Sequence, residues 1–155
     1  METDPRKENE IRQKNRGAVF ALFRRGGEWS RQQIAGELGL SLPTVTQNLK
    51  ELTELGLVCR TGTMACTVGR RATAYALASR ARIAVGLDIT RRQVTAVALD
   101  LRGRVLCTLR RSRSFDRSPA YSALLGELVQ EAVHLAGGTD TQVLGVGIAL
   151  PGLPT

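Results

Sequence analysis

The sequence is poor in the residues from which metal sites and catalytic triads are usually built. Its three cysteines, Cys59, Cys66 and Cys107, are widely spaced, which fits neither a disulfide framework nor a CxxC half-site for a metal. His134 is the only histidine, so a zinc site or a Ser-His-Asp triad has little to draw on. We therefore expect no metal, no cofactor and no catalytic residue.

Long apolar stretches are also missing. No run approaches the roughly 18 apolar residues of a transmembrane helix. Residues 1–14 are polar, without the apolar segment of a signal peptide. These absences predict a cytoplasmic protein with no membrane partner. Aromatic residues amount to only 4%, but the hydrophobic fraction of 43% is ordinary for a globular chain, so wholesale disorder is not expected.

Basic charge is what the sequence has in excess. It contains 22 Lys and Arg residues, most of them arginine, against 14 Asp and Glu, for a formal net charge of +8. Arginine suits phosphate and guanine recognition because it is always charged and donates hydrogen bonds in a planar fork. Residues 1–82 hold 14 basic and 8 acidic residues, whereas residues 83–155 hold 8 and 6. Nucleic acid is therefore the first partner to consider, contacted mainly through the first half of the chain.

Three helices are predicted in this first half. Residues 9–25 have apolar side chains at helical spacing and are followed by a glycine pair. Ser30 and Gln33 are spaced as a capping box that begins a second, short helix. After a glycine-containing turn, Ser41 is placed to cap a third helix with Pro43 in its first turn. The buried stripe expected of the first helix comprises Ile11, Val19, Leu22 and Phe23.

Two short helices joined by a tight turn, with another helix packed behind them, are typical of a helix-turn-helix. With Val45 and Leu49 turned inward, the outward face of the third helix is polar and free of carboxylates until Glu51, as entry into a major groove requires. A small helical bundle with merely solvated basic residues is the alternative. The residues predicted to contact DNA from this motif are Arg31, Ser41, Pro43, Thr44, Thr46, Gln47 and Lys50.

A basic β-hairpin is predicted after the third helix. Residues 57–59 and 74–77 read as two short strands, and the segment between them contains glycines and the pair Arg70 and Arg71. Such a hairpin is the wing of a winged helix. We expect its two arginines to contact the adjacent minor groove or its phosphates.

The second half reads as three strands, a helix and a fourth strand. The strands are expected at residues 83–88, 94–99 and 105–109, the helix at 119–135 and the last strand at 143–150. The first three strands should form an antiparallel meander. The first of them ends in Asp88.

The order and spacing of several motifs resemble the N-terminal portion of a ROK-family transcriptional regulator. The matching stretches are residues 40–46, which read LSLPTVT, the Gly69-Arg70-Arg71 triplet, residues 84–90, which read AVGLDIT, and residues 143–152, which read VLGVGIALPG. The resemblance implies a winged helix-turn-helix followed by a truncated α/β subdomain of the actin-like, ROK ATPase type. It divides the chain into a flexible N-terminus over residues 1–8, a DNA-binding domain over 9–78, a linker over 79–82 and a partial ROK domain over 83–155.

Family members of this kind are sugar-responsive regulators, usually repressors, that bind operators as dimers or higher oligomers. The resemblance therefore implies a double-stranded DNA operator as partner, a homodimer or higher homo-oligomer, and a sugar or sugar phosphate bound by a full-length form. Pro151 and Gly152 match the loop that helps to form the family's sugar-binding cleft.

The same comparison argues against catalysis. ROK kinases have DxGxT after the first strand, whereas this chain has Asp88-Ile89-Thr90-Arg91-Arg92, so an ATP phosphate loop is not expected. The chain also stops three residues after Gly152, before the family's catalytic and zinc motifs, which predicts a fragment or a truncated gene product with an exposed apolar sheet face. A ROK-type sugar kinase with an N-terminal extension and a winged-helix protein-interaction module are the two alternatives.

Overall fold

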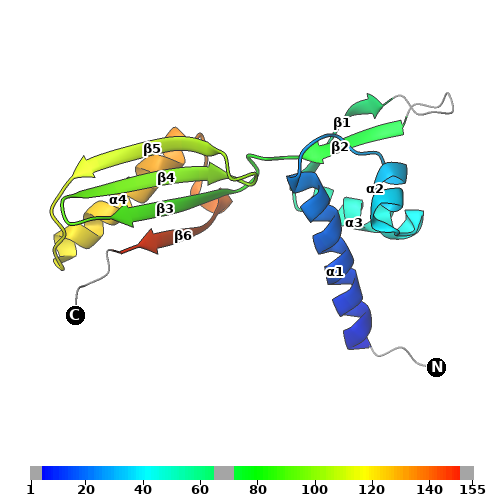
Figure 1. Cartoon of the computed structure of the whole chain (residues 1–155), viewed down its shortest axis with the longest axis horizontal. Coiled ribbons are helices and arrows are strands. Elements are labelled where there is room, and N and C mark those ends of the chain that lie inside the picture. The colour runs from blue at the N-terminus through cyan, green and yellow to red at the C-terminus, as the bar shows by residue number, and fades with distance from the viewer. Residues whose placement is uncertain (1–4, 65–71, 151–155) are drawn as a thin grey trace. The chain divides into compact units, whose positions relative to one another are not determined.

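The computed structural model describes residues 5–64 and 72–150, and it divides the chain into two compact units, residues 1–78 and 79–155. The N-terminal unit is mainly helical, with a two-stranded sheet (Figure 1). The C-terminal unit is a four-stranded mixed sheet with one long helix. A helix-turn-helix followed by a mixed sheet is the coarse fold that the sequence predicted.

The N-terminal unit contains α1 (Pro5–Arg24), α2 (Arg31–Leu38) and α3 (Leu42–Glu54), followed by β1 (Val58–Met64) and β2 (Ala72–Leu77). The two strands are antiparallel, and an isolated bridge pairs Trp29, just before α2, with Tyr75 of β2. The hairpin thereby lies against the helices. The core of this unit comprises Val19, Leu22, Phe23, Ile34, Val45, Leu49, Leu52, Val58 and Leu77.

The first helix differs from its prediction at its N-terminal end. It begins at Pro5, so residues 5–8, which we expected to be flexible, form its first turn. Proline is tolerated in a first helical turn because the missing N–H has no partner there in any case, and Glu8 complements the positive end of the helix dipole. Ile11 is 59% exposed and does not belong to the buried stripe, since it lines an open hollow between α1 and the start of α3.

The C-terminal unit contains β3 (Ile83–Ile89), β4 (Gln93–Asp100), β5 (Val105–Ser112), α4 (Pro119–Leu135), a 3₁₀ turn (Asp140–Gln142) and β6 (Val143–Ala149). The strand order is β5-β4-β3-β6. Strands β3, β4 and β5 form the predicted antiparallel meander, and β6 pairs with β3 in parallel.

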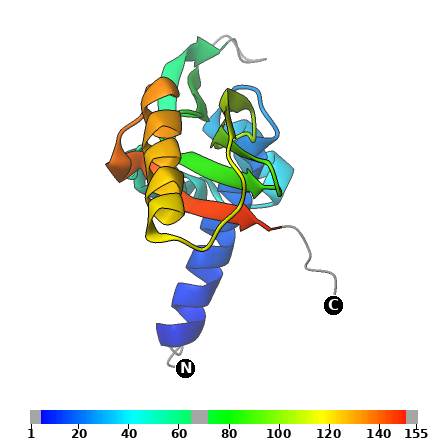
Figure 2. The same ribbon diagram turned by 90° about the vertical axis from the view of Figure 1, so that its left-hand side faces the viewer.

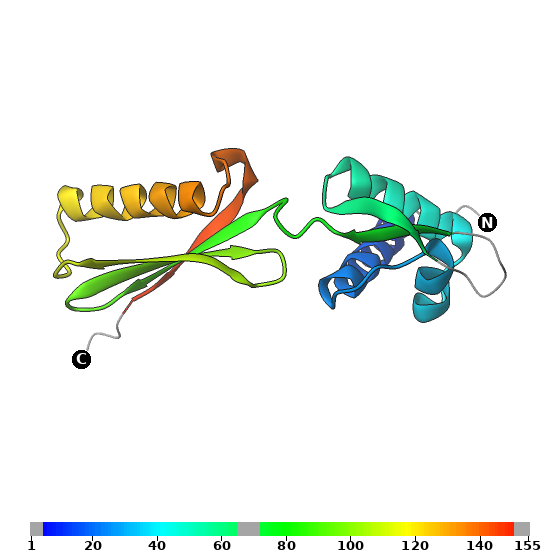
Figure 3. The same ribbon diagram turned by 90° about the horizontal axis from the view of Figure 1, so that it is seen from above.

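Helix α4 covers one face of this sheet, as Figures 2 and 3 show from two directions. Alternate residues of β3 and β4 point to it, including Val85, Leu87 and Ala96, and pack against Leu128 and Ala132. The edge strand β6 is not covered in this way. Its apolar residues Leu144, Val146 and Ile148, and Leu150 just after it, are 44% to 63% exposed.

Candidate nucleic-acid interface

Both ends of α2 are defined by local contacts. The Ser30 Oγ accepts from the Gln33 N–H at 3.3 Å, and the Gln33 Oε1 accepts from the Ser30 N–H at 2.8 Å, so the predicted capping box is present. Gly39 ends α2 with a φ of 61°, a left-handed conformation that suits glycine. The capping box thus begins α2, and Gly39 ends it at the turn that leads into α3.

Ser41 begins α3 as its N-cap. Its Oγ accepts from the Thr44 N–H at 3.3 Å and lies 2.8 Å from the Thr44 Oγ1. Pro43 follows in the first turn. Ser41 is exposed and Thr44 is half-buried, so this end of α3 combines polar side chains with the positive end of a helix dipole, an arrangement that favours phosphate.

The faces of α3 are divided as its sequence predicts. Val45, Asn48, Leu49 and Leu52 are buried. Among the predicted DNA contacts in this helix, Thr44 is half-buried. The exposed ones are Pro43, Thr46, Gln47 and Lys50. The structure therefore brings the third helix's predicted contacts to one solvent-facing side.

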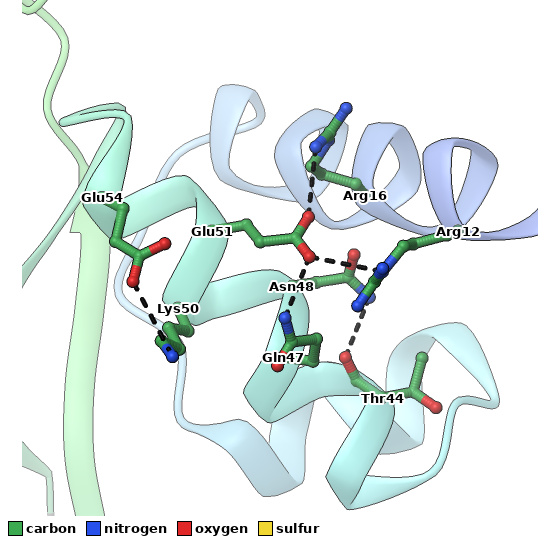
Figure 4. A network of polar contacts seen from close by, with 8 residues as sticks. All are labelled: Arg12, Arg16, Thr44, Gln47, Asn48, Lys50, Glu51 and Glu54. Carbon is green, nitrogen blue, oxygen red and sulfur yellow. Dashed lines mark hydrogen bonds and ion pairs between the residues drawn. The ribbon is translucent and has the colours of Figure 1, made fainter. Parts of the chain in front are cut away.

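Internal hydrogen bonds limit what these exposed side chains offer. The Thr46 Oγ1 donates to the Leu42 carbonyl oxygen at 2.8 Å, which leaves its methyl group and a lone pair outward. The Gln47 Nε2 donates to the Glu51 Oε1 at 3.0 Å. The Lys50 Nζ lies 3.9 Å from the Glu54 carboxylate, an exposed pair that contributes little stability (Figure 4).

Glu51 is the centre of a polar network that sequence reasoning missed. Besides Gln47, it pairs with the Arg12 Nε at 3.3 Å and the Arg16 Nη1 at 3.1 Å, both from α1 (Figure 4). The pKa of Glu51 lies below its ordinary value, first because Gln47 donates to it and then because of the two guanidinium groups. Arg16 lies 35 residues from Glu51 in the sequence, so local patterns carried no signal for the contact between α1 and α3. Gln47 is one helical turn from Glu51 on the same helix, and a local pattern could have found it.

A concave surface with both charged and apolar side chains lies between α2, α3 and the hairpin. A concavity of about 290 Å³ is lined by Arg31 of α2, Thr46 and Lys50 of α3, and Arg60 of β1, among others. Arg60 was not predicted as a contact, although it directly follows the predicted strand of residues 57–59 and could have been assigned to the hairpin on that ground. Three cations and the carboxylate of Glu54 meet on this surface, so its net charge is positive, which favours phosphate.

Four predicted contacts cannot be placed. Arg70 and Arg71 of the wing, and Pro151 and Gly152 of the proposed sugar loop, lie outside the described residues. The strands that carry the wing are described, and they extend further toward its tip than predicted, to Met64 on one side and Ala72 on the other.

The segment after β3 forms a turn that is stabilised by hydrogen bonds between Thr90 and Gln93. The Thr90 Oγ1 donates to the Gln93 carbonyl oxygen at 3.0 Å and accepts from the Gln93 N–H at 3.2 Å. The Arg92 carbonyl oxygen accepts from the Arg113 N–H. Within residues 5–64 and 72–150, no cluster of three or more His, Cys, Asp or Glu side chains could hold a metal ion, and no helix is long and apolar enough to cross a membrane.

Residues 13–59 match a family model described as a helix-turn-helix domain. The chain is 34% identical over 96 residues to the DNA-binding transcriptional dual regulator NagC of Escherichia coli K12 and, with the same figures, to the N-acetylglucosamine repressor of Shigella flexneri. These matches cover 62% of this chain and 24% of each relative.

A crystal structure of a ROK family transcriptional regulator, a homolog of the E. coli MLC protein, is similar in fold as well as in sequence. It is 26% identical and superposes with a TM-score of 0.65 over 92% of this chain and 36% of that one. The chain thus spans about a quarter of the curated relatives that it matches and about a third of this structure. The chain is therefore similar in sequence and fold to a ROK family transcriptional regulator, and its residues 13–59 carry a helix-turn-helix.

Proposed function

We propose that this chain binds double-stranded DNA sequence-specifically and acts in transcriptional regulation, as a repressor of sugar-related genes. The observation that carries the proposal is the exposed polar side of α3, which the capped turn after α2 projects from a helix-turn-helix. The curated relatives named above, which include an N-acetylglucosamine repressor, support the regulatory role. Cytoplasmic location follows from this function.

In this proposal the contacts divide into two groups. Arg31, Lys50 and the wing arginines Arg70 and Arg71 position the protein on phosphates, while Thr46 and Gln47 meet base edges in the major groove. Ser41, Pro43 and Thr44 lie at the dipole end of α3 and contact the backbone. Affinity therefore falls steeply as salt rises.

The test is to select DNA from a random pool and then compare variants on the selected duplex and on random duplex. Gln47→Ala is expected to relax sequence preference by ~1–3 kcal/mol for the lost base contact. Arg70→Ala is expected to weaken binding to both duplexes alike and to lower the salt dependence. Equal losses on the two duplexes for Gln47→Ala would contradict base reading.

The C-terminal unit is proposed to be the beginning of an actin-like, ROK-type effector domain. Its mixed sheet, with β6 parallel to β3, supports this assignment. A sugar or sugar phosphate would be bound by a longer form of the protein through a cleft that includes Pro151 and Gly152. Release of the selected DNA by N-acetylglucosamine or its phosphates, measured by gel shift with a full-length relative as control, tests this point.

Association into a homodimer or higher oligomer is also proposed. The exposed apolar residues of β6 support it, since patches of this kind commonly mark contact surfaces. Light scattering over a range of concentrations would measure the mass directly. A mass that stays at 16.8 kDa throughout would contradict self-association of this chain.

The proposed function excludes sugar kinase activity, and the relatives that support it are regulators by name. A coupled assay that detected sugar-dependent ATP turnover would reverse this part of the proposal. A winged helix that contacts protein instead of DNA is the other alternative, and failure of the chain to retain any duplex from a random pool would favour it.

A further inference from the structure

Glu51 holds one of the exposed side chains proposed to read bases, that of Gln47. Gln47 and Glu51 are one helical turn apart on α3, and the Gln47 Nε2 donates to the Glu51 Oε1 at 3.0 Å (Figure 4). Gln47 is exposed, whereas the Glu51 side chain is only 19% exposed because α1 lies beside it. The carboxylate is therefore the fixed partner of the two.

Chemistry dictates which end of the Gln47 amide faces Glu51. An ionised carboxylate can only accept hydrogen bonds, so the amide nitrogen must face it and the amide oxygen must point away. Glu51 is ionised at neutral pH, since its pKa lies below its ordinary value through the donors Gln47 and Arg16 and the charge of Arg12. A flipped amide would place two acceptors against each other.

The held amide retains a specific pattern for a ligand. One N–H of Gln47 is committed to Glu51, while the second N–H and the Oε1 remain free on the solvent side. One donor beside one acceptor matches the N7 and N6 edge of adenine in the major groove, whereas guanine offers two acceptors there.

Arg12 and Arg16 make the arrangement stable near DNA. A lone carboxylate beside the recognition face would repel phosphates, but the two guanidinium groups lie 3.3 and 3.1 Å from Glu51 and offset its charge. They also hold it against α1, so the Gln47 side chain is ordered before any DNA arrives. A group that is already ordered loses less conformational entropy on binding.

We propose that Glu51 is a positioning residue that fixes the Gln47 amide to read adenine in an A·T pair of the bound DNA. The inference rests on the proposed DNA-binding function. It deepens that function by naming the base that one position prefers and the residue that enforces the preference.

The experiment is selection of duplexes from a random pool by the full chain and its variants, followed by affinity measurements with each base at every selected position. In the wild type, the position that loses discrimination in Gln47→Ala is expected to hold adenine. Glu51→Ala is expected to reduce discrimination at that same position by roughly fivefold or more, within the range of a lost bidentate contact. The variant that carries both Gln47→Ala and Glu51→Ala is expected to lose no more discrimination at that position than Gln47→Ala alone.

Glu51→Gln supplies a second readout that does not depend on loss of binding. A glutamine at position 51 can accept from or donate to the Gln47 amide, so both orientations become available. The flipped amide presents two donors, which suit guanine. The preference is therefore expected to broaden from adenine to either purine, and this variant serves if Glu51→Ala fails to fold.

Glu54→Ala is the matched control, because it removes an equal charge from α3 without touching Gln47. Adenine preference retained in Glu51→Gln, or equal effects of Glu51→Ala and Glu54→Ala, would overturn the inference and leave DNA binding intact. The inference would also be overturned if the DNA position that loses discrimination in Gln47→Ala held a base other than adenine. Absence of any sequence preference in the wild type would overturn the proposed function, and this inference with it.

Discussion

At the scale of single residues, hydrogen bonds within α3 decide which groups remain for DNA. Thr46 donates its only hydroxyl hydrogen to the Leu42 carbonyl, so it can meet DNA as a methyl group or as an acceptor. The methyl group of Thr46 can pack against the methyl group of thymine, and its hydroxyl oxygen can accept from a base amino group. Exposure of a side chain therefore does not by itself define its contact chemistry.

Asn48 is a buried polar residue whose hydrogen-bonding capacity is only partly used. It is 2% exposed, its Nδ2 donates to the Thr44 carbonyl at 2.9 Å, and its Oδ1 has no partner among the described residues. Burial of an unpaired acceptor costs about 1–3 kcal/mol, which exceeds the net gain of about 1 kcal/mol from one hydrogen bond.

We therefore expect Asn48→Leu, which keeps a similar shape, to raise the free energy of unfolding by about 1 kcal/mol. Urea denaturation of the wild type and the variant measures the difference. Asn48→Asp is the control, and it is expected to destabilise because it buries a charge. A clear loss of stability in Asn48→Leu would mean that the Oδ1 has a partner, such as a buried water.

At the scale of elements, how well the sequence predicts structure depends on how local the stabilising contacts are. The boundaries of α2 and α3 follow from serine caps and Gly39, all within a few residues of the helix ends, and these predictions are confirmed. The exposure of Ile11 could not be predicted, since it depends on how α1 packs against α3. The same holds for Arg16 and Glu51, which are 35 residues apart.

The contact between α1 and α3 is expected to weaken in acid. The pKa of Glu51 is lower in the folded protein than in the unfolded chain, through its bond from Gln47 and through Arg16 and Arg12. A lowered pKa gives stability that is present above the unfolded value and is lost as the pH falls through the folded value.

The melting temperature of the N-terminal unit should therefore fall more steeply below about pH 5 in the wild type than in Glu51→Gln. Thermal unfolding of both proteins across pH 3 to 7 measures the difference. The pKa of Asp116 is also lowered, by hydrogen bonds from Ser118. Because Asp116 is present in both proteins, its effect on the pH dependence of stability is the same in each and does not contribute to the difference between them. Parallel curves for the two proteins would show that Glu51 does not link the helices.

At the scale of the whole molecule, the chain consists of two units with separate cores. Phe23, Ile34 and Leu49 belong to the first, and the cluster of β3, β4 and α4 to the second. The excess of basic charge lies mainly in the first, so the unit that would meet DNA is also the more cationic. The second contributes a sheet with an exposed edge strand, β6.

Because each core is formed within its own unit, we expect two separable unfolding transitions in calorimetry. One substitution in each unit assigns each transition to its unit. Ser30 caps α2 through the Gln33 N–H, and Ser118 caps α4 through the Tyr121 N–H at 3.1 Å. Loss of an N-cap costs about 1 kcal/mol, or a few degrees for a unit of this size.

Ser30→Ala should lower only the transition of the N-terminal unit, and Ser118→Ala only that of the C-terminal unit. Loss of specific DNA binding on heating should follow the first transition alone, because base reading is proposed to reside in α3. If both variants shifted one common transition, the two units would unfold as a single cooperative body. DNA recognition would then depend on the stability of the C-terminal sheet as much as on the helix-turn-helix.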